Sequence, residues 1–391
     1  MKPRTGTRQR GKPSRSNGSI PGDGLRRHPS TTTAVGTGFL ALDIVIAEGR
    51  EQHPRTWAGG TCGNVLAILA YLGWRAYPVA SLGMDAGAER VIADLTELGV
   101  DVRFIRKDPA RRTPIVIERI RTLASGLPRS RFVWTCPWCG AWLPGYQAVL
   151  VKDMEAVVAS MPDPAVFFFD RVSRGALDLA TASAARGALV VFEPSSVGDE
   201  RLFRKALGLS HVLKYSHERL SGIGERLGEG APLLEVETLG AEGLRYRLRG
   251  PLGRRDWRLL DAYGVTDVKD TVGAGDWCTA GLIHVLGAEG AARLMRADTA
   301  AVEAALRLGQ ALAALTCAYE GARGGMYAMD KRQFRAAIKT ILAGGSPSAR
   351  AELPDTGLKK LWKAVCPACG PKRGTERPPT EGKNAQGKIA P

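Results

Sequence analysis

Hydrophobic and polar positions follow two alternating patterns from residue 34 onward, and both predict regular structure. Short apolar runs typical of buried strands recur with helix-compatible sequence between them, at residues 34–46, 79–82, 165–170, 188–193, 211–215 and 233–238. The last four runs follow one another about 20–25 residues apart, which is the spacing of β-α-β units. Near-continuous apolar strands indicate a sheet covered on both faces. The pattern predicts a doubly wound, mostly parallel α/β sheet flanked by helices.

Helical patterns fill the intervals and close the domain. They cover residues 64–72, 86–98, 275–286 and 297–319. The segment 101–135 differs, because it alternates and is rich in arginine, as in PIVIERIR at 114–121. We expect this segment to form a small sheet that projects from the main one. The predicted organisation is one α/β domain over residues 31–344, between basic, disordered tails at 1–30 and 345–391.

The net charge of +16 is distributed unevenly along the chain, and its distribution affects which partner is expected. Residues 1–30 contribute +7 and residues 345–391 contribute +5, which leaves only +4 on the long middle segment. A basic chain invites a nucleic-acid-binding reading, but here the basic excess belongs mainly to the tails. Nucleic acid is therefore not the expected partner of the domain.

Cysteine usage and hydropathy bear on the compartment. Seven cysteines in 391 residues are too few, and odd in number, for a disulfide framework of the secreted type. No apolar stretch in the sequence approaches the length of a membrane span. We expect a soluble, cytoplasmic protein without a membrane partner.

The segment 270–276, DTVGAGD, carries the most chemical information. It is followed at once by an apolar helical run, so Gly273, Ala274 and Gly275 would bring backbone N–H groups together at a helix N-terminus. Such a turn is a site for an anion. Asp276 at the same place could act as a general base beside a bound phosphate. The alternative is an aspartate that caps an ordinary glycine-rich turn.

DTVGAGD resembles the C-terminal signature of the ribokinase-like (PfkB) carbohydrate kinase family, DTxGAGD. Three further segments are similar to motifs of that family in the same order: GFLALD at 38–43, GGTCGN at 59–64 and VETLGAEG at 236–243. The resemblance extends over about residues 34–328. It implies an ATP- and Mg²⁺-dependent kinase that phosphorylates a hydroxyl group of a sugar or nucleoside-like molecule.

The resemblance also implies roles for individual residues. Asp276 would deprotonate the acceptor hydroxyl, and the turn from Gly273 to Gly275 would hold the transferred phosphate. The substrate would contact Asp43, Gly59, Gly60, Asn64 and Asp170, although Asp170 could instead cap the end of its strand. The nucleotide would contact Lys214, Ser216, Thr238, Gly240, Gly243 and Thr271. The arginine-rich segment 101–135 takes the place of the family's β lid, through which a homodimer is a further expectation.

One departure from the family pattern affects Mg²⁺. An Asn or Ser with a Glu three positions later usually places the metal and the phosphates. Ser216 fits, but Arg219 stands where the Glu is expected, and Glu218 comes one position early. Glu218 is the candidate Mg²⁺ ligand.

Two short cysteine motifs fall outside the family pattern. Cys136 with Cys139, and Cys366 with Cys369, both form CPxCG sequences of the type that holds tetrahedral zinc. We expect one shared, structural Cys₄ zinc site that fixes the C-terminal tail beside the lid. A redox disulfide at the first pair, or two separate structural pairs, are the alternatives.

A second function also stays open at the level of sequence. The basic tails could bind nucleic acid or an acidic partner, with the kinase-like domain acting as a catalytically weak ligand sensor.

Overall fold

The computed structural model of the chain describes residues 25, 32–50, 53–124, 126–220, 222–223, 232–250, 253–254, 256–347, 353, 364–366 and 368–369. Nearly all of both predicted tails therefore lies outside the described residues. The prediction that the tails are disordered, and the sensor function that rests on their charge, stay predictions.

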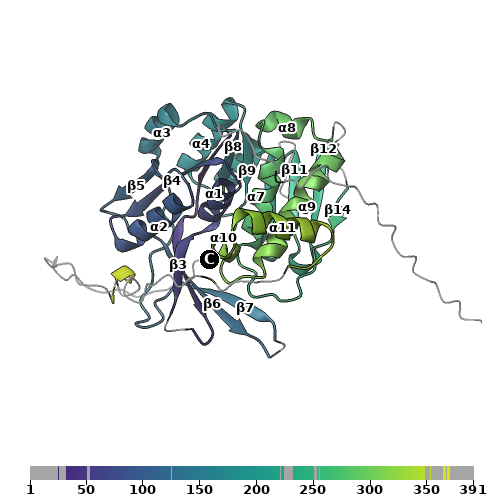
Figure 1. Cartoon of the computed structure of the whole chain (residues 1–391). Coiled ribbons are helices and arrows are strands. Elements are labelled where there is room, and N and C mark those ends of the chain that lie inside the picture. Colours follow the sequence, from purple (N-terminus) through teal and green to yellow (C-terminus); the bar gives the residue numbers. More distant parts are fainter. Residues whose placement is uncertain are drawn as a thin grey trace, which may run out of the picture.

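A ten-stranded, mostly parallel sheet forms the body of the molecule (Figure 1). Its strands run in the order β13-β12-β11-β10-β9-β8-β1-β4-β5, and β14 also pairs with β12. Their bounds are β1 (Thr33–Thr37), β4 (Arg75–Gly83), β5 (Ile105–Asp108), β8 (Val166–Phe169), β9 (Leu189–Phe192), β10 (Val212–Ser216), β11 (Leu234–Thr238), β12 (Leu244–Gly250), β13 (Gly253–Arg254) and β14 (Arg258–Leu260). Strands β5 to β11 along this order are parallel, whereas β12 runs antiparallel to its neighbours. The predicted fold class is confirmed.

Side chains of the central strands alternate between two apolar layers. In β8, Val166 and Phe168 join one core cluster, while Phe167 and Phe169 join the other. This is the consequence of period-two side-chain direction in a strand that is buried on both faces.

Helices cover each face of the sheet. One core cluster includes residues of α1 (Thr61–Tyr71), α2 (Ala86–Glu97), α7 (Ala274–Leu286), α8 (Ala291–Met295), α9 (Thr299–Thr316), α10 (Gly324–Ala328) and α11 (Lys331–Leu342). The other includes residues of α3 (Met154–Ser160), α4 (Arg174–Ala185), α5 (Glu200–Leu209) and α6 (His217–Leu220). The four predicted helices are confirmed within a few residues. Among the helices that the structure describes, none combines the length and apolar character that a membrane crossing would need.

A second, four-stranded sheet projects from the body, in the order β3-β2-β6-β7 (Figure 1). It consists of β2 (Ala41–Ala47), β3 (Arg55–Gly59), β6 (Ile115–Thr122) and β7 (Pro128–Val133). We call it the lid sheet. Its extent differs from the predicted segment 101–135, because β5 pairs with β4 in the main sheet and half of the lid comes from residues 41–59.

The prediction of a single strand over residues 34–46 is wrong, because this run is also divided between the main sheet and the lid sheet. The chain leaves the main sheet after β1 and enters the lid sheet as β2. Between them Gly38 adopts a φ of 144°, and a Cβ there would lie 1.7 Å from Oδ1 of Asp170. Only glycine permits this turn, so an apolar run that looks continuous is divided between two sheets.

Candidate active site

Polar side chains gather where the parallel strands of the main sheet end. Asp170 follows β8, Glu193 follows β9, and Ser216 and Thr238 end β10 and β11. The carboxyl ends of parallel strands lie at one edge of a sheet, which is where ligands bind in open α/β folds.

The turn before α7 has the geometry of an anion site. Gly273 is the N-cap residue and is left-handed, with a φ of 80°. A Cβ at Gly273 would lie 2.5 Å from the carbonyl oxygen of Ala322, so no other residue fits. The first turn of a helix presents backbone N–H groups without carbonyl partners in the helix, and Asp276 lies in that turn. The turn from Gly273 to Gly275 forms where the motif predicted it.

Asp276 is held by a residue from the other motif. Nδ2 of Asn64, in α1, donates a 2.7 Å hydrogen bond to Oδ2 of Asp276. Desolvation, followed by the negative charge of Glu193, raises the pKa of Asp276 to about 7. A carboxylate with a pKa near neutral suits proton transfer at physiological pH.

A buried ion pair between Lys214 and Glu193, which the sequence did not predict, lies next to the anion turn. Nζ of Lys214 donates to Oε1 of Glu193 over 2.5 Å, and Oγ1 of Thr279 donates to Oε2 over 2.5 Å. The same hydroxyl oxygen lies 3.1 Å from the carbonyl oxygen of Gly275, so the two acceptors share its one proton. Lys214 was expected at the nucleotide, but its side chain is 2% exposed and is engaged by Glu193. The available signal was the carboxylate at the end of the apolar run 188–193.

Asp43 lies in β2 of the lid sheet, directly against Gly59. A Cβ at Gly59 would lie 1.9 Å from Cγ of Asp43, so glycine is required for the carboxylate to sit there. Desolvation raises the pKa of Asp43 to about 7. Among the described residues, Oδ1 of Asp43 and Oδ1 of Asn64 are buried without a hydrogen-bond partner. Unsatisfied buried acceptors are uncommon in proteins and call for a ligand or a catalytic role.

Asp170 is engaged within the protein through both oxygens. Its Oδ1 accepts a 2.8 Å hydrogen bond from the backbone N–H of Phe39, and its Oδ2 accepts one of 2.8 Å from Arg171. The carboxylate thus holds the turn between β1 and β2. Of the two sequence-based interpretations, this geometry favours the structural one.

The residues expected at the nucleotide lie at the same edge of the sheet. Ser216 and Thr238 are paired in register at the ends of β10 and β11. Gly240 and Gly243 shape the turn between β11 and β12, where the N–H of Gly243 donates to the carbonyl oxygen of Gly240 over 3.1 Å. Thr271 is exposed at the start of the anion turn.

The candidate Mg²⁺ ligand Glu218 is exposed on α6 beside Ser216. Among the described residues, carboxylates do not gather into a group of three or more that could hold a metal. This fits Mg²⁺, which is usually bound through one or two carboxylates together with water and substrate phosphates. Arg219, which replaces the expected Glu, lies close enough for its charge to lower the pKa of Asp276.

The lid sheet is latched to the first residue of the DTVGAGD motif. Oγ of Ser130, in β7, donates a 2.6 Å hydrogen bond to Oδ1 of Asp270, which also accepts from the N–H of Val272 over 3.0 Å. Glu118 of β6 is 2% exposed, and burial followed by the charge of Asp270 raises its pKa well above the ordinary value. The lid and the anion turn are therefore directly connected.

Comparison with known proteins bears on the family resemblance and on the fold. Residues 235–328 match the pfkB family carbohydrate kinase, which confirms the resemblance carried by the motifs. No curated protein matches the chain in sequence.

Solved structures show the same fold. Arabidopsis thaliana ribokinase complexed with ribose and ATP is 19% identical, with a TM-score of 0.56 over 80% of this chain and 99% of that one. A fructokinase double mutant from Vibrio cholerae O395, with fructose, ADP and potassium ion bound, is 20% identical, with a TM-score of 0.60 over 81% and 100%. Burkholderia thailandensis nucleoside kinase in complex with inosine is 17% identical, with a TM-score of 0.57 over 81% and 99%. Similarity at this level establishes the fold.

Proposed function

We propose that the protein is an ATP-dependent phosphotransferase that acts on a hydroxyl group of a sugar or nucleoside-like molecule. The observation that carries the proposal is the position of Asp276. It lies in the first turn of α7, directly after the anion turn, and is oriented by Asn64. A proton acceptor and a phosphate site are thereby combined in one turn of helix.

Asp276 would take the proton of the acceptor hydroxyl as the oxygen bonds to the terminal phosphorus of ATP and the bond to ADP breaks. Backbone N–H groups of the anion turn would stabilise the negative charge on the transferred group. Mg²⁺ bound with the nucleotide would neutralise part of the phosphate charge, and Glu218 is the carboxylate we assign to it.

Asp43 and Asn64 would bind the acceptor molecule. Each has a buried Oδ1 that lacks a partner among the described residues, and each oxygen can accept a hydrogen bond from a hydroxyl group. Gly59, at the end of β3, has no side chain and so leaves room for the carboxylate of Asp43 beside the proposed acceptor site. Acceptor oxygens of this kind favour a ligand with several hydroxyl groups, a description that covers both sugars and ribosides.

The test is ATP turnover with a panel of pentoses, hexoses and nucleosides. We expect activity with at least one acceptor, and we expect Asp276→Asn to lower kcat by about 10²–10⁴ while the variant still binds ATP. Asp267→Asn, which removes a carboxylate that is 59% exposed and forms a surface ion pair with Lys269, is the matched control. Near-wild-type turnover by Asp276→Asn would contradict the assignment of the base.

The pH dependence provides a second readout of the same residue. Because the base must be ionised and its pKa is raised to about 7, kcat/KM should fall as the pH drops below 7 and level off above it. A profile that is flat between pH 5 and 8 would argue against Asp276 as the base.

A further inference from the structure

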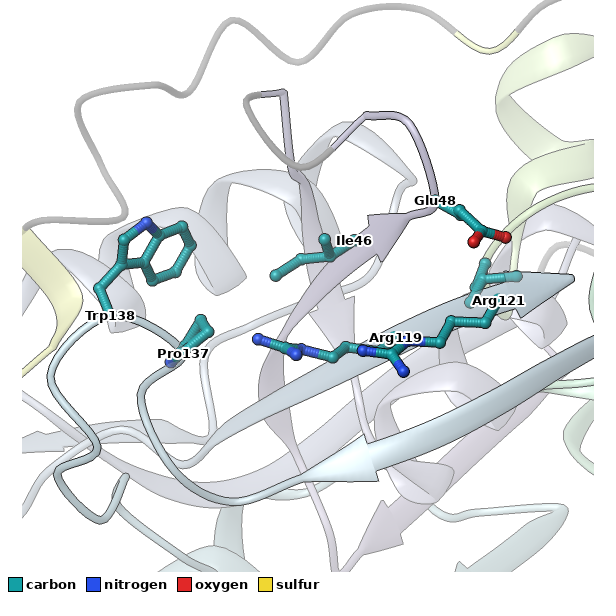
Figure 2. Close-up of a pocket in the computed structure, with 7 residues that line it drawn as sticks. Ile46, Glu48, Arg119, Arg121, Pro137 and Trp138 are labelled. Carbon is teal, nitrogen blue, oxygen red and sulfur yellow. The ribbon is translucent and has the colours of Figure 1, made fainter.

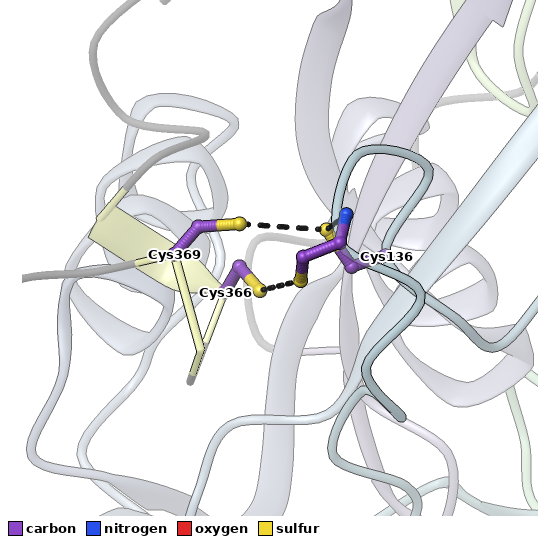
Figure 3. Close-up of side chains that lie close together, drawn as sticks. Cys136, Cys366 and Cys369 are labelled. Carbon is purple, nitrogen blue, oxygen red and sulfur yellow. Dashed lines mark hydrogen bonds between the residues drawn. The ribbon is translucent and has the colours of Figure 1, made fainter.

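The two cysteine motifs, which the proposed function does not use, come together in space. Sγ of Cys136 lies 3.8 Å from Sγ of Cys369, and Sγ of Cys139 lies 3.6 Å from Sγ of Cys366 (Figure 3). All four sulfur atoms lie within 4.8 Å of one another. The pairs are separated by more than 220 positions along the chain, so local sequence does not explain their meeting.

The spacing of the sulfur atoms fits a metal rather than disulfides. Zinc–sulfur bonds of about 2.3 Å arranged as a tetrahedron place neighbouring sulfur atoms about 3.8 Å apart. The distances of 3.8 Å and 3.6 Å are close to this value. A disulfide requires about 2.05 Å, and none of the four cysteines lies within that distance of another.

The first pair is held in a compact loop that presents its sulfur atoms. The N–H of Cys136 donates to the carbonyl oxygen of Ala141 over 2.8 Å, and the N–H of Gly140 donates to the carbonyl oxygen of Cys136 over 2.9 Å. The N–H of Cys139 points at Sγ of Cys136 over 3.3 Å. An N–H donor directed at sulfur favours the thiolate, the form that binds a metal.

The loop lies against the lid sheet on the face that turns away from Asp43. Pro137 and Trp138 line a pocket of about 310 Å³ together with Ile46 and Arg119 of the lid strands (Figure 2). Ile46 and Arg119 are paired in register and alternate with Asp43, so they point to the opposite face. Arg119 and Arg121 line the same pocket as Pro137 and Trp138 of the loop that carries the first cysteine pair.

We propose that Cys136, Cys139, Cys366 and Cys369 bind one structural zinc ion, which fastens the part of the chain that carries Cys366 and Cys369 to the loop that follows the lid sheet. A shell of four thiolates leaves no open coordination position, so the ion has no part in the reaction. The proposal does not depend on the kinase function. It adds a metal-dependent link between the part of the chain that carries Cys366 and Cys369 and the face of the lid sheet that turns away from Asp43.

Metal analysis of the full-length protein, purified under reducing conditions, tests the site. We expect one zinc per chain, and four thiols that react only after the metal is displaced. The double variant Cys366→Ser/Cys369→Ser should lose at least nine-tenths of the zinc. Cys317→Ser, which removes a cysteine outside the cluster, is the matched control and should retain it.

Several outcomes would overturn the proposal. These are wild-type protein without zinc, a mass four daltons lower that reveals two disulfides, or a Cys366→Ser/Cys369→Ser variant that still binds one zinc through the first pair alone. If that variant does not fold, cobalt exchanged into the wild-type protein decides the matter. Cobalt should give the intense visible absorption of a tetrahedral thiolate site, and weak octahedral bands would contradict it.

The link itself has a separate readout in hydrogen exchange. Displacing zinc from the wild-type chain should raise amide exchange in 136–142 and 364–369, while α7 and α9 remain protected. Unchanged exchange in both segments would show that the metal fastens nothing.

Discussion

At the residue scale, the site is built from groups whose partners come from distant parts of the chain. The DTVGAGD motif was enough to predict a glycine turn that opens a helix with Asp276 in its first turn, because this geometry is local. The carboxylate of Glu193 was visible in the sequence, but its partners Lys214 and Thr279 are 21 and 86 positions away. No spacing rule connects them, so the ion pair beneath the turn could not be predicted.

Replacing one partner of this ion pair should lower the free energy of unfolding more than replacing both partners. Glu193→Gln leaves the ammonium of Lys214 buried and unpaired, and loss of one partner of a buried pair typically costs about 3–5 kcal/mol of unfolding free energy. Urea unfolding of Glu193→Gln, Lys214→Met and the double variant measures this as a double-mutant cycle. We expect the double variant to be more stable than Glu193→Gln. Strictly additive losses would contradict the coupling.

At the scale of the element, the strands were predictable but their assignment to sheets was not. Hydrophobic runs predicted β1, β8, β9, β10 and β11, because strands buried on both faces carry an unambiguous pattern. The division of the run 34–46 depends on Asp170, which holds the N–H of Phe39 from 131 positions away. Likewise, alternation in 101–135 indicated strands without showing that β5 joins the main sheet.

The latch between the lid and the anion turn should respond to pH through Glu118. Its pKa is raised in the folded protein, so its favourable contribution is complete below the ordinary pKa of glutamate and is lost as the pH rises through the native pKa. Glu118→Gln keeps the shape and a hydrogen-bond donor but does not ionise. Urea unfolding from pH 5 to 9 should therefore show a gain in stability for Glu118→Gln over the wild type at the alkaline end. Glu289→Gln, at an exposed surface ion pair, is the control and should follow the wild type. An equal pH dependence for wild type and Glu118→Gln would show that Glu118 does not couple the latch to pH.

At the scale of the whole molecule, the body could be predicted and the surface of the lid could not. The spacing of the apolar runs was enough for a parallel sheet covered by helices. The side chains that gather around the lid come from β7, from the loop after it and from a segment beyond the domain, and only the fold brings them together. Trp134, Trp138 and Trp142 are 41%, 50% and 77% exposed there.

These tryptophans bear on the homodimer that the resemblance implied. Exposed large apolar side chains gathered in one region mark protein interfaces, and all three tryptophans lie in the loop that directly follows β7, so we expect the lid region to mediate self-association. Sedimentation velocity should show a dimer that Trp142→Glu weakens at least tenfold. Leu259→Glu places the same charge on another side chain, 70% exposed on β14, and should leave the dimer intact. A wild-type monomer at micromolar concentration would rule the dimer out.

The separation of the two cysteine pairs also has a consequence in time. Cys139 precedes Cys366 by 227 positions, which the ribosome covers in roughly 10–45 s at about 5–20 residues per second. During that interval the first pair is a half-site with two ligands, and the lid strands that precede it are already complete. A full set of four thiolates exists only after the whole kinase-like domain has been synthesised. Zinc uptake would therefore come late in synthesis, once Cys369 has been added to the chain.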